Sequence, residues 1–185
     1  MIEKKSNKLT VRPAHAEELA AVVQILSEAR AVMEERGISQ WTREYPSSAD
    51  LRADLERGRL YVAVKDGCPI AAAQILCEGD PSYREIDGAW RGQGAHIAMH
   101  RVTVSSQMPR CGAATALILY AEECGRAHGA TSLRMDTHPD NLPMQALLEK
   151  CGFFPCGRVK EPVTGKWHLA YEKPLTEQAK KKSLL

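Results

Sequence analysis

Residues Met99–Ala130 read MHRVTVSSQMPRCGAATALILYAEECGRAHGA, and this stretch decides the fold of the chain. A β-branched segment ending at Val104 enters a short loop, which opens a helix with Gly112, Ala113 and Ala114 at its start. The first backbone N–H groups of a helix lack internal partners, and the helix dipole favours negative charge there. Because little side-chain bulk covers those N–H groups, the sequence predicts a seat for a phosphate or pyrophosphate.

Other nucleotide-binding loops fit this stretch poorly. A dinucleotide loop has three glycines spaced G-x-G-x-x-G, and a Walker loop has Gly-Lys-Ser/Thr, whereas only Gly112 is present here. Segment Arg91–Ala95 is richer in glycine, but the residues after it, His96–Val104, read as a strand. A phosphate loop needs a helix behind it, so we interpret Arg91–Ala95 as a flexible connection into that strand.

The predicted phosphate loop resembles the pyrophosphate loop of the GNAT N-acetyltransferases. That family's pattern is Gln/Arg-x-x-Gly-x-Gly/Ala after a strand ending in Val, and Gly112 and Ala114 match its last two positions. Pro109 stands where the family usually has Gln or Arg, and the neighbouring Arg110 can neutralise phosphate charge. The loop therefore departs from the family pattern at one side-chain contact.

The segment downstream strengthens the resemblance. A strand over Ser132–Thr137 is followed by a helix that ends in glycine, and the matching family positions are Asn141, Ala146, Leu147, Glu149, Lys150, Gly152 and Phe153. The resemblance extends more loosely from Leu9 to Tyr171. It implies a single-domain α/β (α+β) fold with a mixed, mostly antiparallel sheet, helices on both faces, and strands splayed apart at the cofactor strand.

The resemblance also implies acetyl-CoA as cosubstrate, lying in the gap between the splayed strands. Exposed strand backbone suits an amide-containing ligand, so the pantetheine amides would pair with the backbone of Val102–Val104. The residues expected to bind the cofactor are Val102, Thr103, Val104, Arg110, Cys111, Gly112, Ala113, Ala114, Thr115 and Asn141. No metal is expected, because no cysteine or histidine spacing suggests a metal site.

Acetyl transfer to an amine needs a group that accepts the amine proton, and histidine titrates near neutral pH. Strand alternation predicts one shared face for His96, Ala98, His100, Val102 and Val104. His100 is the first candidate base on that face. His138, near Asp136 at the end of the next strand, is the second. The alternative for both is structural: a hydrogen-bonded strand histidine, or a loop that caps the next helix through Asp140 or Asn141.

The proton donor for the departing thiolate is not assigned by the sequence. Many family members have a Tyr after the helix Leu for this role, and here that position is Leu148. Tyr83, Tyr120 or water are the remaining candidates. Leu148 therefore keeps an alternative function open beside a cytoplasmic N-acetyltransferase: a CoA-binding regulatory or interaction module with little or no catalysis.

Composition narrows the class of protein and the kinds of partner. The chain has 185 residues, 44% of them hydrophobic, with a formal net charge of +2, which favours one globular domain and neither a nucleic-acid nor a membrane partner. Six cysteines without a Cys-x-x-Cys pair, and no apolar leader, favour free thiols and a cytoplasmic location. We expect a disordered tail over residues 1–7, the domain over 8–174 and a basic tail over 175–185. A homodimer is a further expectation from the resemblance.

The expected acceptor is an amine of a small molecule or peptide. Four aromatic residues outside the motifs either line its pocket or pack on the core: Trp41, Tyr45, Tyr83 and Trp90. The long segment 78–94 is predicted as a loop that covers the acceptor site or is simply solvated. Its acidic residues, Glu78, Asp80, Glu85 and Asp87, would favour a polycationic acceptor.

Overall fold

The computed structural model describes residues 9–175, so the predicted tail over residues 1–7 lies outside the described residues. Leu175, the first residue of the predicted C-terminal tail, is buried, and its N–H donates to the Thr131 carbonyl at 2.8 Å. The rest of that tail lies outside the described range. Within 9–175, no helix is both long and apolar enough to cross a membrane.

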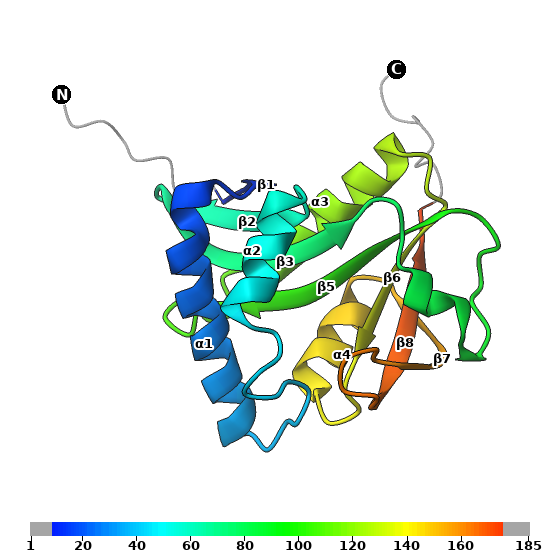
Figure 1. Ribbon diagram of the computed structural model, residues 1–185. Coiled ribbons are helices and arrows are strands. Elements are labelled where there is room, and N and C mark those ends of the chain that lie inside the picture. The colour runs from blue at the N-terminus through cyan, green and yellow to red at the C-terminus, as the bar shows by residue number, and fades with distance from the viewer. Residues whose placement is uncertain (1–8, 176–185) are drawn as a thin grey trace.

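One mixed sheet forms the centre of the fold (Figure 1). Its strands are β1 (Thr10–Pro13), β2 (Leu60–Lys65), β3 (Cys68–Leu76), β4 (Asp87–Gly88), β5 (His96–Val104), β6 (Ser132–Thr137), β7 (Phe154–Lys160) and β8 (Trp167–Pro174). Their spatial order is β1-β2-β3-β5-β6-β8-β7-β4. Among these pairings only β5–β6 is parallel, which confirms the predicted mostly antiparallel sheet.

Helices cover both faces of the sheet, as predicted. They are α1 (Leu19–Glu35), α2 (Ser48–Glu56), α3 (Ala113–Ala127) and α4 (Leu142–Lys150), with short 3₁₀ turns η1 (Ala16–Glu18) and η2 (Pro81–Arg84). Val22 of α1 and Leu51 of α2 pack with Val62 on one face. Leu117 of α3 and Leu148 of α4 share the larger core on the other face. Apolar residues at helical spacing explain both contacts, because each helix buries one stripe.

The sheet opens between β5 and β6. Parallel pairing runs only from His96↔Ser132 to Ala98↔Arg134, whereas β6 stays paired with β8 as far as Thr137↔Leu169. The second half of β5 therefore has no strand partner on its β6 side. This confirms the predicted splay at the cofactor strand and leaves backbone N–H and C=O groups of β5 free for a ligand.

A β-bulge corrects one sequence prediction about β5. Gln74 pairs with His100 and Ala72 with Thr103, so β5 carries one extra residue, and Arg101 has a φ of 53°. The extra residue shifts the side-chain alternation. Val102 and Val104 consequently pack with the α3 core, whereas Ala98 packs on the opposite face. The prediction that all five alternate residues share one face was wrong beyond His100.

The glycine-rich segment 91–95 does precede a strand, as predicted. Its backbone N–H groups are used inside the protein, because those of Arg91 and Gly92 donate to Glu172 Oε2 at 2.5 and 2.9 Å. Glu172 is fully buried and also accepts from Arg134 Nε at 2.8 Å. These N–H groups are therefore already satisfied by a carboxylate of the chain itself.

Candidate active site

A pocket of about 350 Å³ lies at the N-terminus of α3. Seven of the predicted cofactor residues line it: Val104, Arg110, Cys111, Gly112, Ala113, Ala114 and Thr115. Leu147 and Lys150 of α4 complete the wall. Sequence reasoning matched Lys150 to a family motif but did not place it at the cofactor. Its ammonium and the Arg110 guanidinium bring two positive charges to the pocket, which suits a pyrophosphate.

The first turn of α3 is arranged as an anion seat. Gly112 is the residue before the helix and has a φ of 84°, a conformation that side chains with a Cβ rarely adopt. The first helical hydrogen bond runs from the Ala116 N–H to the Gly112 carbonyl at 2.9 Å. The N–H groups of Ala113, Ala114 and Thr115 precede it and have no carbonyl one turn back. They carry the positive end of the helix dipole.

The other predicted cofactor residues lie outside this pocket. Val102 and Thr103 are buried in β5, and the Thr103 hydroxyl donates to the Ala72 carbonyl at 3.3 Å. Asn141 caps α4, because its Oδ1 accepts from the Met144 N–H at 3.2 Å and its Nδ2 donates to Gln40 at 2.7 Å. The capping alternative considered for this loop is therefore present in the structure.

A second pocket, of about 320 Å³, lies on the other face of the sheet. It includes His100 of β5 and Asp136 of β6, so it bridges the two strands that splay apart. Side chains from η2, the α1–α2 connection and β8 close it, among them Asp80, Tyr83, Trp41, Tyr45 and His168. The two pockets thus contact β5 from opposite faces.

His100 lies between two carboxylates in this second pocket. Its Nε2 is 2.8 Å from Asp80 Oδ2 and its Nδ1 is 3.4 Å from Asp136 Oδ1. Burial lowers the pKa of His100, but the two carboxylates outweigh burial and raise the pKa to about 9. Burial acts to raise the pKa of Asp80, yet His100 brings it down to about 2. At neutral pH the pair is an imidazolium and a carboxylate.

Asp136 is the centre of the network. Its Oδ1 accepts from the Tyr83 hydroxyl at 2.5 Å, and its Oδ2 is 2.5 Å from His168 Nδ1. Burial would raise the pKa of Asp136, but hydrogen bonds from His100 and His168 hold it well below its usual range. Burial and the Asp136 charge raise the pKa of Tyr83 far above its ordinary value. Asp136 is therefore ionised and Tyr83 neutral.

His138, the second predicted base, lies beside this pocket. Its ring meets the His168 ring edge-on with centroids 5.8 Å apart, and its Nδ1 accepts from the Asp140 N–H at 3.2 Å. Burial lowers the pKa of His138, and the charge of Asp140 only partly compensates. His138 is therefore neutral at pH 7 and half-buried at the loop after β6.

The bulge in β5 places a charged side chain on the pocket wall. Arg101 forms an ion pair with the buried Asp54 of α2, and its Nη2 donates to the Tyr45 hydroxyl at 3.2 Å. Asp54 also accepts from Gln74 Nε2 at 2.5 Å. These contacts connect α2, β3 and β5, and Gln74 and Arg101 also line the second pocket.

The predicted acidic cluster is dispersed in the structure. Of its four members only Asp80 lines the second pocket. Glu78 pairs with Arg59, and Asp87 pairs with Arg158 at 2.5 Å. Trp90 is also outside this pocket, because its Nε1 donates to the Tyr83 carbonyl at 2.8 Å and its ring packs in the core.

The two tyrosines weighed as proton donors occupy different places. Tyr83 is buried in the second pocket with its hydroxyl committed to Asp136. The Tyr120 ring lies 5.4 Å from the Tyr61 ring on the α3 face. Leu148, at the position of the family tyrosine, is completely buried in the core. None of the three therefore presents a free hydroxyl to the splay.

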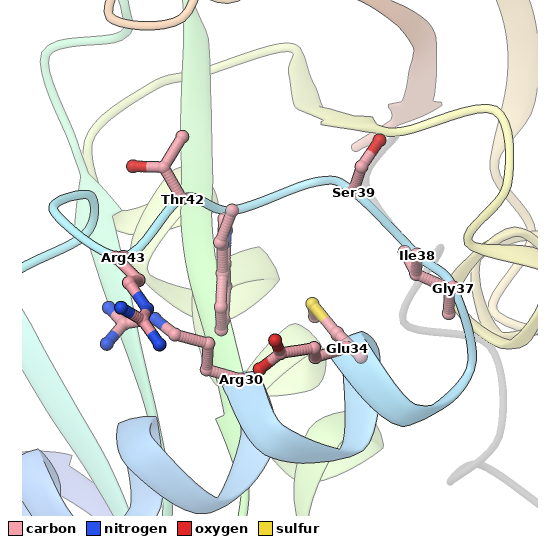
Figure 2. Close-up of a pocket in the computed structure, with 9 residues that line it drawn as sticks. Arg30, Glu34, Gly37, Ile38, Ser39, Thr42 and Arg43 are labelled. Atoms are coloured by element: carbon pink, nitrogen blue, oxygen red, sulfur yellow. The ribbon is translucent and has the colours of Figure 1, made fainter.

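A third pocket lies at the end of α1, where the connection to α2 leaves the helix. Figure 2 shows Arg30 and Glu34 on the helix and Ser39, Thr42 and Arg43 on the connection. Trp41 lines both this pocket and the second pocket, so the two pockets are neighbours. Among residues 9–175, no group of three or more His, Cys, Asp or Glu side chains is placed to hold a metal ion.

Comparison with known proteins gives consistent matches. A sequence model described as the acetyltransferase (GNAT) family matches residues 21–153. A GNAT-family acetyltransferase from Streptococcus agalactiae 2603 is 30% identical, with a TM-score of 0.80 over 90% of this chain and 95% of that one. A putative acetyltransferase from Staphylococcus aureus Mu50 is 26% identical, with a TM-score of 0.66 over 90% and 99% of the two chains.

A more distant structure shows the same fold with a ligand. A putative acetyltransferase from Salmonella typhimurium, solved with its cofactor acetyl-CoA, is 16% identical and has a TM-score of 0.65 over 96% of this chain and 100% of that one. Among proteins of curated function, no sequence matches this chain.

Proposed function

Because the chain belongs to the acetyltransferase (GNAT) family, we propose that it is an N-acetyltransferase that moves the acetyl group of acetyl-CoA to a primary amine. The acceptor is a small molecule or peptide that attacks the thioester directly while both substrates are bound. The single observation that carries this proposal is the pair of pockets on opposite faces of β5, at the point where its pairing with β6 ends.

The residues at the α3 pocket fit the pyrophosphate of acetyl-CoA. Gly112 has a positive φ of 84°, which glycine adopts without strain, and this conformation leads the loop into the first turn of α3. Arg110 and Lys150 supply charge, and the first N–H groups of α3 supply donors. The unpaired edge of β5 can then accept the pantetheine amides and direct the thioester between the strands.

The second pocket fits an amine. Asp80 and Asp136 are ionised there, and carboxylates attract the ammonium form in which most amines arrive. Positioning of the amine against the thioester contributes to rate even without a dedicated acid for the thiolate. The base roles predicted for His100 and His138 stay predictions. A protonated His100 can act as a base only after a bound substrate has separated it from one of its carboxylates.

The cysteines support a reducing compartment. All six are free: Cys68, Cys77, Cys111, Cys124, Cys151 and Cys156. Free thiols persist in the cytoplasm, where we place the reaction. No metal takes part in the proposed reaction.

The experiment is thiol release from acetyl-CoA against polyamines, amino acids, aminoglycosides and short peptides, paired with calorimetry of acetyl-CoA binding. Release with one amine class, matched by acetylated product in mass spectrometry, is the expected result. Binding of acetyl-CoA without release from any amine would overturn the transferase proposal. It would favour the CoA-binding module instead, which the buried Leu148 at the usual donor position would then explain.

A further inference from the structure

His168 of β8 was not identified as a candidate from the sequence, because no motif surrounds it. Its side chain is 3% exposed and lines the second pocket. One ring nitrogen, Nδ1, lies 2.5 Å from Asp136 Oδ2, while the other, Nε2, is buried with no hydrogen-bond partner among residues 9–175. A buried polar nitrogen without a partner costs free energy, and His168 shares this feature in the second pocket with Nε2 of His100. An unpartnered nitrogen on a residue that lines a pocket is a candidate contact for a bound ligand.

The hydrogen bond to Asp136 fixes the tautomer of His168. An ionised carboxylate only accepts hydrogen bonds, so Nδ1 must carry the hydrogen. In the neutral ring, Nε2 then holds the lone pair. This is the relation in which a carboxylate orients a histidine base in hydrolase triads. Asp136 meets the requirement, since His100 and His168 outweigh burial and keep its pKa low.

His100 differs from His168 because it has two carboxylate neighbours instead of one. Both of its nitrogens lie near carboxylate oxygens, Nε2 at 2.8 Å from Asp80 Oδ2 and Nδ1 at 3.4 Å from Asp136 Oδ1, although Nε2 does not meet hydrogen-bond geometry. Two negative charges beside the ring favour its protonated form. Asp136 therefore contacts two histidines with different surroundings: His100 has a carboxylate beside each ring nitrogen, whereas His168 has one only beside Nδ1. With the hydrogen on Nδ1, the ring nitrogen that can accept a proton from a substrate is Nε2 of His168.

We infer that Nε2 of His168 is the general base that takes the proton of the acceptor ammonium, directly or through one water molecule. The inference rests on the proposed function. Nε2 removes one proton, and the lone pair of the neutral amine forms the C–N bond. The C–S bond breaks with its electron pair on sulfur, a second nitrogen proton passes to that sulfur, and His168 returns its proton to solvent.

The charged and titratable groups around His168 come from several elements. Asp136 of β6 contacts it directly, and His138 packs against its ring. The remaining ones share the pocket: Asp80, Tyr83, His100, Lys160 and Glu161.

The first test needs no substrate. Two-bond ¹H–¹⁵N correlation spectra of the free protein at neutral pH report the hydrogen positions on each histidine. The expected result is hydrogen on Nδ1 alone for His168 and on both nitrogens for His100. Hydrogen on Nε2 of His168, or on both of its nitrogens at pH 7, would overturn the inference. Because these spectra use the wild-type protein, the result stands even if substitution of His168 prevents folding.

The second test is His168→Gln, with His128→Gln on the exposed end of α3 as the matched control. We expect His168→Gln to lower kcat/KM for the amine at neutral pH by about 100-fold or more. The control keeps wild-type activity, and calorimetry gives an unchanged Kd for acetyl-CoA in both. The deficit should shrink as pH approaches the pKa of the amine, because a neutral amine needs no base.

The outcomes separate the inference from the proposed function. Loss of activity that is equal at every pH, or a loss below about threefold, contradicts a base role for His168. Wild-type protein that releases no thiol with any amine contradicts the proposed function, while the hydrogen positions on His168 and His100 still decide the two protonation states independently.

Discussion

His100 illustrates how one residue's surroundings fix its chemistry. The folded protein raises its pKa from 6.5 to about 9, so the folded state binds this proton more tightly than the unfolded chain does. The stability that His100 contributes is therefore fully present below about pH 6.5 and is lost as pH rises through 9. Asp80 acts in the opposite direction, since its pKa falls to about 2 and its contribution is lost as pH falls below 3.8.

We predict that His100→Gln destabilises the protein most strongly near pH 5, by roughly 3 kcal/mol, and much less near pH 9. Urea unfolding of the variant and wild type across this range measures the difference in free energy of unfolding. His128→Gln should show no such trend. A difference that grows between pH 5 and pH 9 would mean that His100 is not held as an imidazolium.

Substitutions of Ala114 test whether the first turn of α3 binds the pyrophosphate of acetyl-CoA. Ala114→Glu places a carboxylate in the pocket where α3 presents its first N–H groups, so we predict at least a tenfold weaker Kd for acetyl-CoA. Ala114→Gln has nearly the same size without the charge and should weaken binding less. Equal Kd values for both variants and wild type in calorimetry would show that the pyrophosphate lies elsewhere.

Gly112 tests the same seat through backbone conformation. Its φ of 84° disfavours a β-branched residue, so a valine there would force the loop before α3 out of the conformation that presents the free N–H groups. We predict that Gly112→Val abolishes measurable acetyl-CoA binding. Circular dichroism should show retained secondary structure, because no atom lies within 4 Å of the added Cβ. Unchanged affinity in a folded variant would contradict the assignment.

At the scale of elements, the bulge in β5 determines what each pocket contains. The extra residue at Arg101 sends Val102 and Val104 toward α3 and leaves His100 on the acceptor face. It also directs Arg101 to Asp54 of α2. A regular strand would instead have directed two valines to the second pocket, so the bulge separates an apolar wall on the α3 side from a charged wall in the second pocket.

We predict that Asp54→Asn lowers the free energy of unfolding by about 3 kcal/mol, because it leaves the largely buried Arg101 without its counter-charge. Glu56→Gln, on the exposed end of the same helix, is the matched control and should stay within about 0.5 kcal/mol of wild type. Urea unfolding measures both. If the two variants were equally stable, the ion pair between α2 and β5 would not support the site.

The strand over 96–104, the helix that begins after Gly112 and the strand over 132–137 could be predicted from the sequence, because β-branched residues and a glycine mark them locally. The bulge was not predictable, because position 101 is an arginine between His100 and Val102, and no glycine there indicates a positive φ. The segment 78–94 was predicted as a loop, but it contains the 3₁₀ turn η2 and the short strand β4. Their partners are distant in the sequence: η2 contacts Asp136 of β6 through Tyr83, and β4 pairs with β7.

The two pockets of the candidate site differ in how far the sequence could predict them. Most of the α3 pocket comes from residues 104–115, so one motif predicted that part, whereas Leu147 and Lys150 of α4 were not placed there from the sequence. The second pocket is lined by residues from four separate segments: Asp80, His100, Asp136 and His168. The register of β6 with β8 is what brings His168 to Asp136. A histidine within a short apolar strand has no local pattern that distinguishes this role from simple packing.

For the molecule as a whole, the proposed function places two substrates at the opening of the splayed sheet. The α3 pocket offers a helix N-terminus and basic side chains beside the edge of β5, whereas the second pocket holds a buried network of carboxylates and histidines. Strands β5 and β6 are not paired with each other beyond Ala98. The proposed reaction uses this opening for the thioester to reach the amine.

A crystal structure with bound acetyl-CoA would test whether the two substrates lie on opposite faces of β5. We predict pyrophosphate oxygens within about 3 Å of the N–H groups of Ala113, Ala114 or Thr115, and the acetyl group between β5 and β6, facing His100 and His168. Pyrophosphate bound at Gly92–Gly94, or an acetyl group directed away from the second pocket, would rule out this placement.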